Sequence, residues 1–234
     1  MPGPSASKRV SKRARAAALL LAAACAALTV TGTAQAATPL AFETIFTAQG
    51  EPPALHYKAS FAGADGQQHT LQVWRDGQTR LRRSTDDRVD AYVLRAAPDA
   101  DAYQMTVVDY ARRITTRINR DNLLRLGNAS DWFDLAHGLR RPAGPYQLSA
   151  SQRPAQAPAP IAACRWYALR EGASAHRICW SESDRLPLVI WSEQKGAAVW
   201  RVTEVARQPI AGDVFRPRDE GFVRNDADED IDKD

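Results

Sequence analysis

The chain has 234 residues, of which 31 are lysine or arginine, 27 are aspartate or glutamate and 44% are hydrophobic. This composition is typical of a folded globular protein and excludes a disordered or collagen-like chain. The formal net charge of +4 arises in the N-terminal segment, so the basic balance does not indicate a nucleic-acid-binding protein.

The first 36 residues have the three parts of a secretory signal peptide. Five basic residues at positions 8–15 precede an apolar run at 16–30, and Ala34-Gln35-Ala36 has the small-x-small pattern of a cleavage site. We therefore expect export to the periplasm and cleavage after Ala36, which leaves 26 basic and 27 acidic residues. Two alternatives remain open: an uncleaved anchor, and a lipid anchor on Cys25.

The exported part is long enough for one domain, which we place at 37–224. Residues 219–234 carry eight acidic and two basic side chains, whereas residues 37–218 carry 24 basic and 19 acidic ones. From Asn225 onward, the one large aliphatic residue in the sequence is Ile231. A segment of this kind buries too little apolar surface to offset its ordering entropy, so we predict a disordered acidic tail at 225–234.

Hydrophobic periodicity predicts a short helix followed by an antiparallel β-meander. Residues 39–48 have helical spacing, and the segment 50–53, Gly-Glu-Pro-Pro, ends the helix. The period then changes to two: Leu55 and Tyr57 alternate with His56 and Lys58. The predicted strands are 55–62, 68–75, 78–84, 88–95, 102–108 and 112–118, and later 162–170, 175–182, 187–193 and 197–206.

The segment 119–141 interrupts this pattern, because its apolar residues are too clustered for a strand. Gly127-Asn128 divides the segment, and Asn128 with Asp131 three residues later is a cap signal for a second helix that Gly138 ends. We predict two short helices that cover an apolar cavity. Their apolar residues are Leu123, Leu124, Leu126, Trp132, Phe133 and Leu135. The proline-rich stretch 152–160 is predicted to be a surface loop.

After the leader, the remaining cysteines are Cys164 and Cys179. A metal clip with the nearby His176 and a redox pair are alternatives, but no Cys-x-x-Cys spacing supports them. An exported chain with two cysteines is expected to form one intramolecular disulfide. A hairpin that turns at Glu171 and Gly172 would place the two cysteines directly opposite each other, and Trp166 opposite Arg177.

Few residues indicate catalysis. The four histidines lie on different predicted elements, Gly-Ala-Ser-Ala-His at 172–176 lies in a hairpin rather than a nucleophile elbow, and no phosphate-binding glycine loop is present. The acidic tail lacks the glycine and the distal glutamate of a calcium loop. We therefore expect no enzyme, no cofactor and no metal. The candidate ligand-binding residues are aromatic side chains that line an apolar face, namely Tyr57, Trp74, Tyr92, Tyr103, Trp132, Phe133, Trp191 and Trp200.

The order of these elements resembles the outer-membrane lipoprotein carrier family, LolA/LolB-like, and the related periplasmic sigma-factor-regulator sensor domain. The most similar stretch is Asp-x-Leu-Pro at 184–187 before a strand, followed by a Lys-Gly turn at 195–196, and the Phe-x-Pro at 215–217 comes next. The resemblance covers about residues 40–224. The matching segments are 40–50, 55–63, 71–83, 103–118, 119–141, 184–202 and 213–225.

This resemblance implies a mainly β fold: a curved, unclosed antiparallel half-barrel with an N-terminal helix and short lid helices in the middle of the chain. In the carriers an arginine after the second or third strand holds the lid closed, and Arg75 lies near that place. The implied function is a non-enzymatic, monomeric periplasmic protein that binds the acyl chains of a lipid or lipoprotein. The alternative is an envelope-sensing module on the same scaffold, whose partner is an envelope protein.

Overall fold

The computed structural model describes residues 40–125 and 131–231. The predicted signal peptide, its cleavage site, Cys25, Leu126 and Asn128 lie outside the described residues. The helices of the described part are α1 (Phe42–Ile45), α2 (Arg120–Arg125), α3 (Trp132–His137), the 3-10 helix η1 (Gly212–Phe215) and α4 (Ala227–Ile231). The strands are β1 (Ala54–Ala62), β2 (Gln68–Asp76), β3 (Arg80–Thr85), β4 (Val89–Arg95), β5 (Tyr103–Asp109), β6 (Ile114–Asn119), β7 (Tyr146–Ala150), β8 (Arg165–Glu171), β9 (Ser174–Ser181), β10 (Leu186–Ser192), β11 (Ala197–Ala206) and β12 (Val223–Asp226).

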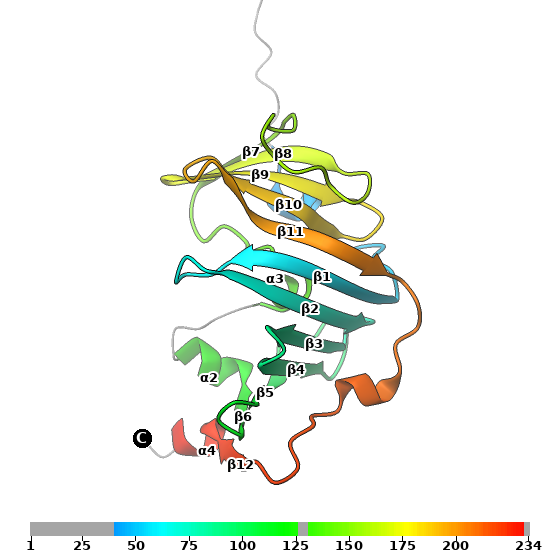
Figure 1. The fold of residues 1–234 in the computed structure, drawn as a ribbon, viewed down its shortest axis with the longest axis vertical. Helices are drawn as coiled ribbons and strands as arrows, with labels where there is room; N and C mark the ends of the chain where they lie inside the picture. Colours follow the sequence, from blue (N-terminus) through cyan, green and yellow to red (C-terminus); the bar gives the residue numbers. More distant parts are fainter. Residues whose placement is uncertain (1–39, 126–130, 232–234) are drawn as a thin grey trace, which may run out of the picture. The chain divides into compact units, whose positions relative to one another are not determined.

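The described strands form one twelve-stranded sheet in the order β12-β6-β5-β4-β3-β2-β1-β11-β10-β9-β8-β7. Two meanders, β1 to β6 and β7 to β11, are joined where β1 pairs with β11. All neighbours are antiparallel except β12, which pairs in parallel with β6. The two ends of the order do not meet, so the sheet is unclosed and resembles a half-barrel (Figure 1). The mainly β prediction is confirmed at this level.

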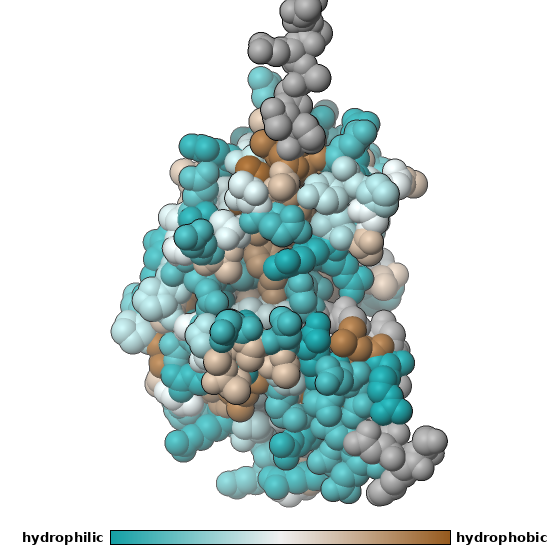
Figure 2. Space-filling model, turned by 180° about the vertical axis from the view of Figure 1, so that it is seen from behind, coloured by the Kyte–Doolittle hydropathy of each residue, from teal (hydrophilic) through white to brown (hydrophobic). Residues whose placement is uncertain are grey.

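One face of the sheet, which we call the inner face, packs against α3. Alternation along β2 puts Leu71, Val73 and Arg75 on this face, and all three are buried. Tyr57 on β1 and Trp200 on β11 belong to the same core cluster. Seen from behind the sheet of Figure 1, hydrophobic side chains form patches separated by hydrophilic ones (Figure 2).

A second core cluster lies at the β7–β9 end, where α1 packs on the sheet. Phe42 is fully buried and Phe46 is 2% exposed. The Phe46 ring contacts Trp180 edge-on, with 5.3 Å between ring centroids. Burying two phenylalanines contributes about 3–6 kcal/mol, which explains how so short a helix is held in place. The helix α1 is shorter than the 39–48 predicted from periodicity.

The Cys164–Cys179 disulfide is present, with 5.4 Å between the Cα atoms. The predicted register of the hairpin is wrong by two residues, because Cys179 pairs with Trp166 and Cys164 precedes β8. The chain reverses at Gly172 and Ala173, since Gly172 has the positive φ of 54° that a two-residue hairpin turn requires. A shift of two residues keeps each side chain on its face, so the cysteines still meet, as diagonal neighbours.

The C-terminal segment differs from the predicted disordered tail. Val223–Asp226 forms β12 and Ala227–Ile231 forms α4. The Asp228 carboxylate accepts hydrogen bonds from the backbone N–H of Asn119 (2.8 Å) and from the side chain of Asn122 (2.9 Å). The backbone pairing of β12 and these hydrogen bonds stabilise the segment, although it has few apolar side chains to bury. Strand β7 was also not predicted.

Candidate functional site on the inner face

Helix α3 is defined by polar caps at both ends. The Asp131 side chain accepts a hydrogen bond from the backbone N–H of Asp134 at 2.7 Å, so Asp131 is the N-cap, rather than Asn128 as the sequence suggested. Gly138 ends the helix as predicted, with a left-handed φ of 67°. A Cβ atom at Gly138 would lie 2.5 Å from the Trp200 ring, so this position requires glycine for its backbone and for its close approach to β11.

Side chains from three neighbouring strands donate hydrogen bonds to the C-terminal end of α3. These are Tyr57 on β1, Arg75 on β2 and Arg83 on β3, and we call them the α3 anchor. The Tyr57 hydroxyl donates to the carbonyl oxygen of Ala136 at 3.3 Å, and an Arg75 N–H donates to the same oxygen at 3.4 Å. Arg83 donates to the carbonyl of Leu135 at 3.1 Å. These carbonyls belong to the last turn and have no partner inside the helix, so cationic donors are favoured there.

A buried ionic network shares Arg75 with the α3 anchor. The carboxylate of Glu51 is 3.3 Å from Arg75 and 3.1 Å from Nε2 of His137. All three side chains are at most 6% exposed. Arg75 also donates to the carbonyl of Asp184 at 3.1 Å, which links α3 to the loop between β9 and β10. Breaking such a network leaves a buried charge without its partner, which is strongly destabilising.

The protonation of His137 depends on its contacts in this network. Its Nδ1 lies 2.9 Å from the carbonyl of Phe133, so Nδ1 carries a hydrogen, and Nε2 faces the Glu51 carboxylate. Burial lowers the pKa of His137, and the hydrogen bond that Nε2 donates to the Glu51 carboxylate opposes this shift. Burial also raises the pKa of Tyr57 to about 12, so its hydroxyl stays a donor. Burial therefore favours the neutral form of His137, whereas its contacts with Phe133 and Glu51 favour the protonated form.

Two pockets flank α3. The first, which we call the apolar pocket, has a volume of about 300 Å³ and lies between the segment after α3 and strands β8 to β11. Its apolar walls are Leu139, Leu169, Ile178, Ile190 and Val199. Arg140 and Arg141 also line it. Its volume is at the lower end of what small-molecule sites occupy.

The second, which we call the mouth pocket, has a volume of about 700 Å³ and is more polar. It opens between α1, the end of β4, the start of α2 and α3. Arg95, Arg120, Trp132 and Phe133 line it, and His137 reaches it from the buried network. The Arg95 guanidinium lies 4.8 Å from the centre of the Trp132 ring.

The structure brings five of the candidate aromatic residues to the inner side. Tyr57, Tyr103 and Trp200 belong to the main core cluster, Trp132 packs against it, and Phe133 belongs to the second cluster. Most of this surface is filled by packing. The aromatic residues that remain open to a pocket are Trp132 and Phe133, since both line the mouth pocket.

Trp74 and Tyr92 lie on the opposite, outer face. Trp74 alternates with the inward Val73 and Arg75, and it stacks on His56 with 4.8 Å between ring centroids. The Arg82 guanidinium lies between the two aromatic rings, 4.6 Å from Trp74 and 5.5 Å from Tyr92. Trp191 also points away from the inner face, because it pairs with Arg177 and follows the inward Ile190.

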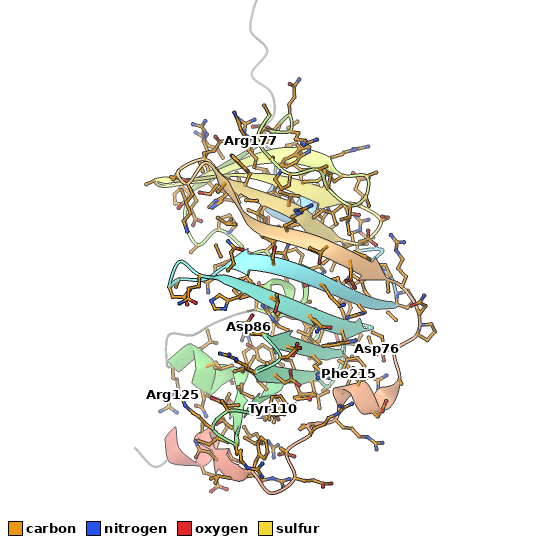
Figure 3. All side chains as sticks on the ribbon, viewed as in Figure 1. Asp76, Asp86, Tyr110, Arg125, Arg177 and Phe215 are labelled. Atoms are coloured by element: carbon orange, nitrogen blue, oxygen red, sulfur yellow. A yellow bond between two sulfur atoms is a disulfide. The ribbon has the colours of Figure 1, made fainter. Side chains whose placement is uncertain are left out.

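This outer cluster has a structural partner in the C-terminal segment. The buried Asp90 carboxylate accepts hydrogen bonds from Arg82, Tyr92 and Tyr110. Arg82 also donates to the carbonyl of Val214, which lies within η1. Figure 3 shows Phe215 near Asp76, and Arg80 contacts both residues. The outer aromatic residues therefore hold the segment that leads to β12.

Sequence reasoning missed Glu51, Arg83 and His137. Alternation could have placed Arg83 on the inner face, because it lies two residues after the buried Leu81. No local pattern marks Glu51, which follows a glycine and precedes two prolines. In the part of the chain that the structure describes, no group of three or more His, Cys, Asp or Glu side chains could hold a metal ion. No helix of the described residues is long and apolar enough to cross a membrane.

Comparison with protein-family models and with curated proteins finds no match to this chain.

Proposed function

We propose that this protein is a non-enzymatic, exported binding protein for the acyl chain of a lipid or lipoprotein, with α3 as a lid over the inner face. The observation that carries this proposal is the α3 anchor. Side chains of three strands hold the helix by bonds to backbone carbonyls, and the apolar and mouth pockets lie on either side of it.

The arrangement supports a closed state of such a binding protein. The apolar pocket of about 300 Å³ gives a chain an entry beside Gly138, where α3 ends. Displacement of α3 would expose Tyr57 and Trp200 and extend this pocket along β1 and β11. Each buried CH₂ of a ligand contributes about 0.8 kcal/mol, so an acyl chain can offset the lost packing of a six-residue helix. The disulfide is compatible with an oxidising compartment such as the periplasm.

A second candidate is an envelope-sensing or protein-interaction module on the same scaffold. The observation that favours it is the filled interior: Arg75 is fully buried on the inner face, and Tyr57 and Trp200 are at most 7% exposed. A face that stays filled would present α3 and its surroundings to a protein partner instead of a cavity to a lipid.

Uptake of a fluorescent fatty acid separates the two candidates. We expect saturable binding by the wild type and faster uptake by Arg83→Met, because this change removes one anchor bond to Leu135 while leaving the buried Glu51 network intact. Arg112→Met is the matched control, since the Arg112 side chain is 78% exposed on the turn between β5 and β6. If neither the wild type nor Arg83→Met binds the probe, the carrier proposal fails and the interaction module stands.

A further inference from the structure

We propose that Arg95 and Arg120 in the mouth pocket bind a phosphate-type anionic group, the head group of the amphiphile whose chain lies on the inner face. This inference rests on the proposed function for the source of the anion, but the anion site itself stands on its own geometry. The packing of α3 does not account for the two arginines in the mouth pocket, and a bound anion does.

Strand pairing places Arg95 and Arg120 on either side of Tyr103. Arg95 is opposite Tyr103 in the β4–β5 pairing. Asn119 is opposite Gln104, so Arg120, the next residue, reaches the other side of Tyr103. Both arginines line the mouth pocket. Two arginines in one pocket attract an anion, because guanidinium groups donate charge-assisted hydrogen bonds to its oxygens.

Within the described part of the chain, Arg95 has no close carboxylate partner, and the ion pair of Arg120 is long and involves a residue outside the pocket lining. Among the residues that the structure describes, no carboxylate lies within 4.0 Å of Arg95, which donates to the carbonyl of Ala100 at 2.7 Å. Burial lowers the pKa of Arg95, against the more distant charges of Asp101 and Asp99. Arg120 has Asp121, its neighbour in sequence, at 3.9 Å.

Trp132 lines the same pocket and contacts Arg95. Its indole N–H is buried and has no acceptor within the described structure. The ring stacks on the Arg95 guanidinium, which fixes the direction of both groups. An oxygen-rich anion would accept hydrogen bonds from the two guanidinium groups, as planar guanidinium donors commonly bind phosphate.

The carboxylates of the pocket are either paired or exposed. Asp131 is 2.9 Å from Arg141, so its charge is compensated. Glu43 and Asp101 are exposed at the rim. These carboxylates disfavour a large polyanion over the whole pocket. A single phosphate group, attached to a chain that continues beneath α3, fits the distribution.

The test compares two lipids with the same acyl chain, a lysophosphatidate and a neutral monoacylglycerol, by displacement of a fluorescent fatty acid. The wild type should bind the lysophosphatidate more tightly. Arg95→Gln and Arg120→Gln should each weaken lysophosphatidate binding about tenfold and leave monoacylglycerol binding unchanged. Arg112→Gln should change neither. Two separate variants keep the test valid if one of them folds poorly, which unfolding midpoints will show.

The outcomes separate the two proposals. Equal binding of both lipids, unchanged in the variants, overturns the anion site and leaves the carrier function intact. Binding of inorganic phosphate that depends on Arg95 and Arg120, without binding of either lipid, supports the anion site with a free phosphate as its source and overturns the carrier function. No binding of lipid or of inorganic phosphate overturns both.

Discussion

Replacement of Arg75 by methionine tests the buried network most severely. Arg75 is 0% exposed and makes an ion pair with Glu51 and hydrogen bonds to the carbonyls of Ala136 and Asp184. Methionine removes these interactions and leaves the Glu51 carboxylate with His137 as its remaining partner. Removing one member of a buried ion pair costs about 3–5 kcal/mol, and we expect a loss of this size in the free energy of unfolding.

The assay is urea unfolding followed by tryptophan fluorescence, with the m-value compared between variants. The double variant Arg75→Met, Glu51→Gln no longer buries an uncompensated charge, so it should be more stable than Arg75→Met alone by at least about 1 kcal/mol. Arg112→Met serves as the exposed control. A loss within about 0.5 kcal/mol of that control would mean that Arg75 is neither desolvated nor paired as described.

Three further predictions concern the rest of the fold. The charged groups that face His137 are Glu51 and Arg75, and the pKa of His137 is lowered in the folded protein. The stability linked to the neutral imidazole is therefore fully present above the ordinary histidine pKa of 6.5, and it is lost as the pH falls below that value. Thermal unfolding between pH 7.5 and pH 5 should therefore show a smaller decline in His137→Asn than in the wild type, and equal declines would contradict this assignment. Asp228→Ala removes two hydrogen bonds to the start of α2 and should cost about 1–2 kcal/mol, which corresponds to about 2–8 °C in melting temperature, and an unchanged melting temperature would show that α4 does not support α2. Reduction of the disulfide opens a loop with a sequence separation of 15 residues and should cost about 3 kcal/mol in denaturant unfolding, with the Cys164→Ser, Cys179→Ser variant showing the same loss without reductant.

Periodicity was sufficient to predict most strands of the sheet, because strands with one buried face alternate strictly. Alternation also predicts which face of the sheet each side chain occupies. Trp74 lies between the inward Val73 and Arg75, and Tyr92 lies between the inward Ala91 and Val93. The outer position of both aromatic residues could therefore be predicted from the sequence. Aromatic character alone was a poor guide to the inner face.

Other features depend on contacts between distant segments and leave no local signal. Glu51 meets His137, which is 86 residues away, and only the folded chain shows this contact. The acidic composition of residues 225–234 predicted disorder, but the segment starts in β12, which pairs in parallel with β6 through backbone hydrogen bonds. The hairpin register was set by Gly172 occupying the first turn position, which shifted the pairing by two residues.

Native mass spectrometry of protein purified from the periplasm of an exporting bacterial host tests most directly whether the inner face receives an acyl chain. We expect a bound species with the mass of one amphiphile, which denaturation releases and which organic extraction identifies as a lipid. A single species with the mass of the bare chain, in protein that also fails to take up a fluorescent fatty acid, would contradict this expectation.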